Sequence, residues 1–248
     1  MEPKKLSLVE VFRSVQGEGY HSGRDAIFVR FAGCNLSCVF AEGVVCDTPY
    51  QQSNLRITPT ELFQFIQKTM FPHPGAVNSP ETTMMILTGG EPTLAPGFDF
   101  LVGMAQREGY YVAIETNGTR WRDGLSMADW VTVSPKDLIQ HGSPSPHHNP
   151  NPQSPEVDLR VEELMTLTRE WAGEYRYVVS SREDHLPPFA PAYRHYLSPA
   201  VMATGDGQEW KRGFPGFAPG AVERCLEIVS QDPRWRLSIQ THKILGVR

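Results

Sequence analysis

The sequence predicts an α/β fold, an open or partial β/α barrel. Two observations carry this prediction. Short runs of β-branched and aromatic residues recur along the chain, and amphipathic helical patterns lie between several of them. Strands that alternate with helices form a largely parallel sheet. With 248 residues and 40% hydrophobic content, the chain is long enough for one such core. We therefore expect a single domain over residues 1–248.

The expected elements follow from these patterns. The strands, in chain order, are Leu8–Phe12, Ile27–Phe31, Met84–Leu87, Tyr111–Ile114, Val131–Val133, Tyr175–Val179 and Trp235–Ile239, with a weaker pattern at Tyr196–Val201. Thr58 and Glu61 have the spacing of a capping box, so a helix is expected to begin there. The other expected helices are Phe98–Glu108, Leu159–Trp171 and Val222–Ser230.

The ends of the strands predict where a site lies. In β/α barrels, ligands gather at the carboxyl ends of the strands. The residues that directly follow expected strands are Gly33, Thr88, Glu115 and Ser134. We therefore expect these positions to share one site.

One segment departs from the alternating pattern. Residues 140–155 are dense in Pro, Ser, Asn and His, so we expect a loop or inserted arm without regular structure. His147 and His148 lie among its prolines, and we expect them to be solvent-exposed rather than metal ligands.

Composition excludes several classes of function. The net charge is -5 and no basic block is present, so no direct nucleic-acid partner is expected. No long apolar run or signal-peptide pattern is present, so we expect no membrane span and a cytoplasmic protein. In that compartment, cysteines more often bind metals or fill a core than form disulfides.

Three of the four cysteines lie in one loop. Cys34, Cys38 and Cys46 follow an expected strand, and their soft sulfur ligands suit either an iron–sulfur cluster or zinc. Structural zinc needs a fourth protein ligand, and no other His or Cys lies nearby in the sequence. Three thiolates on a four-iron cube would leave one iron open to a small molecule. Cys225 instead falls on a helical face with Val222, Leu226 and Val229, which indicates a core residue.

Three further strings follow expected strands. Leu87–Pro92 contains two glycines, which allow a ligand to approach the backbone closely. Ile114–Gly118 ends in Asn-Gly, a common turn signal. Ser134–Lys136 places a proline between a hydroxyl and an ammonium group, which keeps both near the strand ends.

Together these strings resemble those of radical S-adenosylmethionine enzymes. The interval Cys34-Asn-Leu-Ser-Cys38 matches the first half of that superfamily's cysteine motif, but seven residues, Val39 to Val45, separate Cys38 from Cys46. More narrowly, the chain from Val9 to Arg248 is similar to 7-carboxy-7-deazaguanine synthases outside residues 140–155. The motifs that carry this likeness, in order, are Glu10–Gly19, Phe28–Leu36, Cys46–Thr48 and Trp235–Lys243.

The resemblance implies a fold, cofactors and residue roles. The fold would be the partial, abbreviated β/α barrel of the radical S-adenosylmethionine type. Cys34, Cys38 and Cys46 would hold a 4Fe–4S cluster, and Thr48 would bind Mg²⁺, with Asp47 orienting its waters. The implied contacts to S-adenosylmethionine are Gly90, Glu91, Glu115, Asn117, Ser134, Pro135 and Lys136.

The implied reaction converts 6-carboxy-5,6,7,8-tetrahydropterin to 7-carboxy-7-deazaguanine with loss of ammonia. The expected substrate contacts are Val15, Gln16, Gly17, Glu18, Arg30, Thr88, His242 and the terminal carboxylate of Arg248. An amide and a carboxylate at positions 16 and 18 can read the edges of a pterin. Arg30 can pair with the substrate carboxylate, although an ion pair at the end of the sheet is the alternative. The resemblance also implies a homodimer and an electron donor such as flavodoxin or ferredoxin.

Two other functions remain open from the sequence. The first is another small radical S-adenosylmethionine enzyme, such as an activase. The second is a non-enzymatic zinc-binding module, which would bind about one zinc ion and would not cleave S-adenosylmethionine.

Overall fold

One curved sheet of nine strands dominates the computed structural model, which describes residues 4–41, 44–70, 83–136, 139–140, 143–144, 157–167, 173–181, 194–202 and 214–247. The strand order is β13-β12-β11-β8-β7-β6-β2-β1-β5. The strands are β1 (Leu6–Val15), β2 (Asp25–Phe31), β5 (Leu55–Ile57), β6 (Met84–Gly89), β7 (Tyr111–Thr116), β8 (Trp130–Val133), β11 (Gly173–Val179), β12 (His195–Pro199) and β13 (Trp235–Leu237). All eight expected strands are present.

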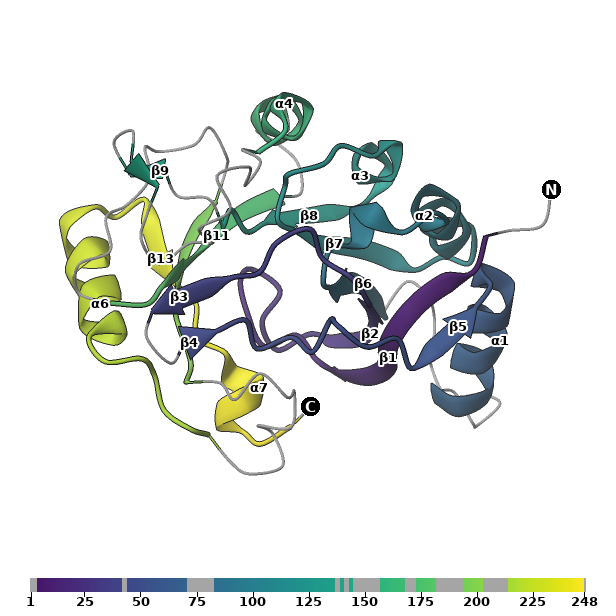
Figure 1. The fold of residues 1–248 in the computed structure, drawn as a ribbon, viewed down its shortest axis with the longest axis horizontal. Helices are drawn as coiled ribbons and strands as arrows, with labels where there is room; N and C mark the ends of the chain where they lie inside the picture. Colours follow the sequence, from purple (N-terminus) through teal and green to yellow (C-terminus); the bar gives the residue numbers. More distant parts are fainter. Residues whose placement is uncertain are drawn as a thin grey trace.

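The pairing confirms a largely parallel sheet. From β2 through β13, neighbouring strands run parallel. At one edge, β1 pairs antiparallel with both β2 and β5. In Figure 1 the sheet forms an arc from β5 and β1, through β6, β7 and β8, to β11 and β13. This arrangement is the expected partial β/α barrel.

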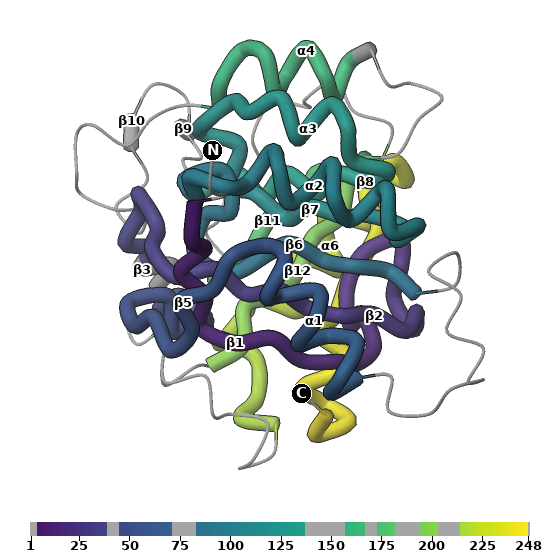
Figure 2. Tube along the Cα trace, turned by 90° about the vertical axis from the view of Figure 1, so that its right-hand side faces the viewer, coloured from purple at the N-terminus to yellow at the C-terminus, as the bar shows by residue number. Residues whose placement is uncertain are grey.

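The helices cover the outer face of the arc, except for the last one, which carries His242 on the inner side. They are α1 (Pro59–Met70), α2 (Phe98–Arg107), α3 (Asp123–Met127), α4 (Leu159–Leu167), α6 (Ala221–Gln231) and α7 (Thr241–Ile244), with a 3₁₀ turn, η1, at Pro92–Leu94. The capping box of α1 is present, because the Glu61 amide donates to Thr58 Oγ1 over 3.2 Å and the Thr58 amide donates to Glu61 Oε2 over 2.6 Å. Figure 2, turned by 90°, shows α3 and α4 on the same side of the sheet as α2.

Alternation along the strands separates two environments. Residues such as Val29, Leu87 and Ile114 point outward into the main core, which the helices complete. Their neighbours Phe28 and Ile86 belong to a second apolar cluster on the inner face. The inner face also carries the polar residues Arg30, Thr88, Glu115, Thr132, Glu174 and Arg176. Polar side chains on a partly enclosed face indicate a binding site.

The loop that follows β1, residues 16–24, ties the two ends of the arc together. The Gly19 amide donates to Ser238 Oγ over 2.8 Å, and the Tyr20 amide donates to Glu174 Oε2 over 2.9 Å. Ser238 follows β13 and Glu174 belongs to β11, so this loop reaches from β1 to the opposite end of the sheet. The Tyr20 ring also stacks on Trp130, with 5.1 Å between ring centroids.

Two expectations need correction. In α6, Cys225 is fully buried as expected, but Leu226 is 52% exposed, so the core face is Ala221, Cys225 and Ile228. Residues 140–155 were expected to lack regular structure, yet β9 (Ile139–Gln140) and β10 (Ser143–Pro144) pair antiparallel at the start of that segment. His147 and His148 lie outside the described residues.

The expected helix Leu159–Trp171 is present as α4, and its last four residues lie outside the described residues. Within the described part of the chain, none of the helices combines the length and apolarity needed to cross a bilayer.

Candidate active site

Most of the predicted site residues line one cavity of about 230 Å³ on the inner face of the sheet. Those residues are Val15, Gln16, Glu18, Arg30, Cys34, Cys38, Cys46, Thr48, Thr88, Gly90, Glu115, Asn117, Ser134, Lys136 and His242. Gly17, Glu91 and Pro135 do not line it. Arg248 lies outside the described residues. The carboxyl ends of the parallel strands therefore meet at one cavity, as predicted from the sequence.

A short hairpin spans the long interval between the second and third cysteines. β3 (Val39–Ala41) and β4 (Val44–Val45) pair antiparallel, with Val39 opposite Val45. The Cys46 amide donates to the Cys38 carbonyl over 3.2 Å. The chain therefore leaves Cys38 and returns beside it, so that Cys38 and Cys46 are neighbours at the base of the hairpin. The extra residues form the hairpin, and the backbones of Cys38 and Cys46 stay side by side at its base.

The environment of the thiols suits a metal cluster. Burial raises the pKa of all three thiols, that of Cys38 to about 12, while the positive charge of Lys136 lowers each of them. The Leu36 amide donates to Cys34 Sγ over 3.4 Å. Partly buried cysteines beside a cation and an amide donor are suited to ligate an iron–sulfur cluster.

The zinc alternative finds no support in the described part of the chain. There, no three His, Cys, Asp or Glu side chains lie close enough to bind a single metal ion. The ligands of a four-iron cube bind different irons, so they do not have to converge on one point. The three cysteines line one cavity, as the resemblance to radical S-adenosylmethionine enzymes implies.

The glycine turn after β6 supports the cysteine loop directly. The Gly90 amide donates to the Phe31 carbonyl over 3.0 Å, and the Glu91 amide donates to the Gly33 carbonyl over 2.9 Å. A Cβ on Gly90 would overlap the Gly33 carbonyl. The sequence suggested that these glycines admit a ligand to the backbone. The structure shows that position 90 must be a glycine because the backbone of the cysteine loop lies against it.

Glu91 has a structural position rather than a place on the cavity wall. Its side chain is 1% exposed. Its carboxylate accepts hydrogen bonds from the Thr93 amide (3.1 Å) and hydroxyl (2.7 Å), the Thr116 hydroxyl (2.8 Å) and the Asn117 amide (2.8 Å). Burial raises its pKa, and these hydrogen bonds oppose the shift. Glu91 therefore joins the turns that follow β6 and β7, and so fixes Asn117 at the cavity.

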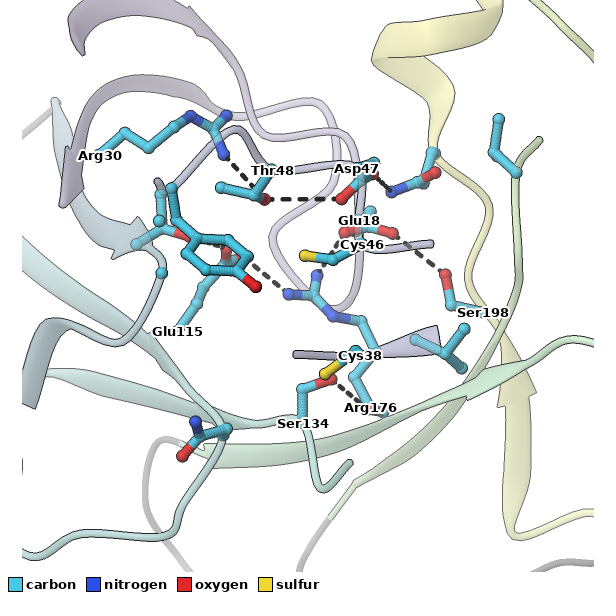
Figure 3. A pocket seen from close by; sticks show the side chains of 18 of the residues that line it. Glu18, Arg30, Cys38, Cys46, Asp47, Thr48, Glu115, Ser134, Arg176 and Ser198 are labelled. Atoms are coloured by element: carbon cyan, nitrogen blue, oxygen red, sulfur yellow. Dashed lines mark hydrogen bonds and ion pairs between the residues drawn. The ribbon is translucent and has the colours of Figure 1, made fainter. Parts of the chain in front are cut away.

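The opposite wall holds a cluster of oxygen donors and cations (Figure 3). Arg30 Nη1 donates to Thr48 Oγ1 over 3.4 Å, and Arg30 Nε pairs with Glu10 over 3.0 Å. Arg30 thus forms the ion pair that was expected as the alternative and also lines the cavity, while its pairing with a substrate carboxylate stays a prediction. Asp47 pairs with Lys243, with 2.5 Å between Oδ2 and Nζ. Burial opposes ionisation of Asp47, but the charge and hydrogen bond of Lys243, together with Arg30 and Gln240, outweigh burial and hold the Asp47 pKa well below its usual range.

Arg176 occupies the centre of the cavity in Figure 3 and was not predicted from the sequence. Its guanidinium lies 2.8 Å from Glu115 and 3.0 Å from Glu18. Ser198, on β12, donates to the other oxygen of Glu18 over 3.0 Å. Two predicted site carboxylates therefore meet at one arginine.

Comparison with known proteins identifies the family. No protein-family model matches the chain. A 7-carboxy-7-deazaguanine synthase of Bacteroides thetaiotaomicron is 32% identical over 239 residues, which cover 96% of this chain and 97% of that protein. A protein of the same name from Neisseria meningitidis is 34% identical over 259 residues, which cover 99% of this chain and 96% of that protein. The chain belongs to the 7-carboxy-7-deazaguanine synthase family.

A solved structure supports the fold. The crystal structure of QueE from Escherichia coli matches with a TM-score of 0.59 and 24% identity, and the match covers 95% of this chain and 94% of that one. The fold is therefore shared with that protein over nearly the whole length of both chains.

Several lining residues were missed in the sequence. Arg176 and Ser198 lie within strands, whereas the predicted site residues, apart from Arg30, lie outside the expected strands. Two charged residues, Glu174 and Arg176, alternate with tyrosines in β11, and that alternation was the available signal. Phe12 and Phe28 also line the cavity, with their rings stacked 5.0 Å apart. They provide an apolar surface suited to a planar ring.

Proposed function

We propose that this chain converts 6-carboxy-5,6,7,8-tetrahydropterin to 7-carboxy-7-deazaguanine as a radical S-adenosylmethionine enzyme. One observation carries the proposal. The three cysteines, Gly90 in the turn after β6, Ser134 and Lys136, and the polar residues Gln16, Glu18 and Arg30 line a single cavity. Relatives that align with nearly the whole chain bear the name of this activity.

The cysteine wall would hold the cofactors. Cys34, Cys38 and Cys46 fit a 4Fe–4S cluster, and Gly90, Asn117, Ser134 and Lys136 would contact S-adenosylmethionine. When bound, the cluster and S-adenosylmethionine together would supply a 5′-deoxyadenosyl radical that removes a hydrogen atom from the substrate. The protein's part is to orient the substrate and exclude water from it. An electron donor of the flavodoxin or ferredoxin class, and a homodimeric state, belong to the same proposal.

The opposite wall would bind the pterin. Glu18 and Gln16 would accept and donate hydrogen bonds at the ring edge, while Phe12 and Phe28 provide a flat apolar surface. Arg30 would pair with the substrate carboxylate. Thr48 would supply an oxygen to Mg²⁺, with Asp47 beside it to orient the waters that this ion retains.

The overall reaction needs no added oxidant or reductant. Loss of one ammonia accounts for the whole difference in composition between the substrate and 7-carboxy-7-deazaguanine. The site therefore has to direct a rearrangement, and rigid placement of the ring matters more than any acid or base strength.

Product analysis tests the proposal. The protein is reconstituted anaerobically with iron and sulfide, then incubated with the carboxylated tetrahydropterin, S-adenosylmethionine, Mg²⁺ and a reductant. We expect 7-carboxy-7-deazaguanine by mass spectrometry, and none from the Cys38→Ala variant. Cleavage of S-adenosylmethionine without this product would indicate a different radical enzyme. Bound zinc and no cleavage would indicate a zinc module.

A further inference from the structure

One arginine joins the two carboxylates on the substrate side of the cavity. Arg176 lies on β11, and its side chain is 7% exposed. Nη2 donates a hydrogen bond to Glu115 Oε1 over 2.8 Å. Nη1 lies 3.0 Å from Glu18 Oε2. Nη1 makes no aligned hydrogen bond with any described residue, so this second contact is an ion pair. The guanidinium thus contacts both carboxylates at once (Figure 3).

The Glu115 carboxylate in turn holds other proposed substrate contacts, and the backbone of Glu18 is tied to one of them. Glu115 accepts hydrogen bonds from Gln16 Nε2 over 3.1 Å and from Thr88 Oγ1 over 2.7 Å. The Glu18 amide donates to Gln16 Oε1 over 3.1 Å. The side chains of Gln16, Glu18 and Thr88 therefore form one network whose common members are Glu115 and Arg176. Moving the guanidinium would disturb all three.

The charges explain why this network needs a cation. Glu18, Glu115 and Glu174 all act on Arg176 electrostatically. Burial alone would raise the pKa of Glu115, but the charge and hydrogen bond of Arg176, helped by Thr88 and Gln16, lower it to about 2. Without the guanidinium, buried carboxylates would face each other with no counterion, and at least one would take up a proton.

We propose that Arg176 is a positioning residue that fixes Glu18, and through Glu115 also Gln16 and Thr88, in the geometry that reads the pterin edge. This inference rests on the proposed function. It gives Arg176 no contact with the reacting atoms. Its effect is on substrate affinity through the side chains that it holds.

The shape of the guanidinium is part of the inference. Its two outer nitrogens contact carboxylates from different parts of the chain. Glu115 belongs to strand β7, and Glu18 belongs to the loop after β1. A lysine ammonium carries the same charge on a single nitrogen and lacks this fork. Arg176→Lys should therefore preserve the charge and lose part of the geometry.

Three variants separate the roles of charge, geometry and stability. Arg176→Met removes the charge, and Arg176→Lys retains it. The matched control is Arg122→Met, because Arg122 pairs with Asp99 at a partly buried site that does not line the cavity. Binding is measured by fluorescence titration with 6-carboxypterin, an oxidised analogue that does not react, at pH values from 5 to 8. Circular dichroism and thermal melting report folding.

We expect Arg176→Met to bind 6-carboxypterin about tenfold more weakly than wild type, or weaker still. Its affinity should also gain a pH dependence between pH 5 and 8, as Glu115 begins to titrate there. Arg176 also lowers the pKa of Glu174, so the gained pH dependence reports the carboxylates around Arg176 together, whereas the pKa of His242 does not depend on Arg176. Arg176→Lys should keep the wild-type pH profile but bind more weakly. Arg122→Met should bind like wild type.

Wild-type affinity and pH profile in both Arg176 variants would overturn the inference. If Arg176→Met fails to fold, Arg176→Lys decides alone, since wild-type affinity in that variant would also overturn it. If the wild-type protein converts the tetrahydropterin and the Arg176 variants bind 6-carboxypterin like wild type, the inference about Arg176 fails but the proposed function stands. A wild-type protein that neither binds nor converts it would overturn both.

Discussion

The carbonyl of Gly33 occupies the space that a side chain on Gly90 would need. Gly33 directly precedes the first cysteine, and Gly90 lies in the turn after β6. The Glu91 amide donates to the same carbonyl over 2.9 Å, and the Gly33 amide donates to the Tyr50 carbonyl over 2.7 Å. The cysteine loop and the glycine turn therefore form one backbone unit, which places the proposed cluster wall beside the proposed cofactor-binding turn.

Gly90→Ala should damage the cysteine loop as well as its own turn. The new Cβ would overlap backbone rather than a flexible side chain, so the loop must move. We expect a loss of about 1–3 kcal/mol in the free energy of unfolding. Iron and sulfide content after reconstitution should fall.

Gly103→Ala is the matched control, because a Cβ there meets only the ends of the Met127 and Arg107 side chains. It should retain full iron content. If Gly90→Ala reconstitutes as completely as Gly103→Ala, the backbone contact is not needed for the cluster site.

The four cysteines should separate into two classes. Cys34→Ala, Cys38→Ala and Cys46→Ala should each lose most of the iron, because each removes one of three proposed ligands. Cys225→Ala should keep its iron and lose only some stability, since Cys225 is buried in α6 against the core. Iron and sulfide per chain are the measurement. A Cys225→Ala protein as poor in iron as the other three would refute the assignment.

Much of the fold could be predicted because the signals are local. Buried strands such as β6 and helices such as α1 show their period and capping residues within a dozen positions. β5, α3 and α7 are three to five residues long and are too short to show a period. The β3–β4 hairpin was hidden within the interval between Cys38 and Cys46, where only the unusual spacing was visible.

The site could be predicted where it follows strand ends, and not where it depends on the curvature of the sheet. Arg176 and Ser198 meet Glu18 because the arc brings β11 and β12 to the loop after β1. That proximity is absent from any local pattern. For Gly90 and Glu91 the residue types were recognised, but the sequence does not show which backbone or hydroxyl groups lie beside them.

Thr48→Ala should weaken the response of turnover to Mg²⁺ while the iron content stays at the wild-type level. The Thr48 hydroxyl is the oxygen proposed to bind the ion, and it faces the cavity between Arg30 and Asp47. Thr48→Ser keeps the hydroxyl and should retain the Mg²⁺ response. The measurement is the initial rate as Mg²⁺ is varied. An identical Mg²⁺ response in the alanine variant would remove Thr48 from the ion site.

His21 should make the protein less stable in mild acid. Burial, together with the charges of Arg24 and Arg194, lowers its pKa from 6.5 to about 4. The unfolded chain then binds the proton more readily than the folded one, so stability is full above pH 6.5 and falls toward pH 4. His21→Phe keeps an aromatic ring beside Trp130 without this titration.

Thermal melting at pH 7 and pH 5 tests this. The melting temperature should fall less in His21→Phe than in wild type between these two pH values, whatever the variant's stability at pH 7. A fall as large as that of wild type would show that His21 is not responsible.

The most direct test of the central claim is the stoichiometry of one anaerobic reaction. The reconstituted protein is given the carboxylated tetrahydropterin, S-adenosylmethionine, Mg²⁺ and reductant, and four species are quantified together: 7-carboxy-7-deazaguanine, ammonia, 5′-deoxyadenosine and remaining substrate. We predict equal amounts of 7-carboxy-7-deazaguanine and ammonia, in excess over the 5′-deoxyadenosine formed. Accumulation of 5′-deoxyadenosine with unchanged substrate and no ammonia would contradict the account.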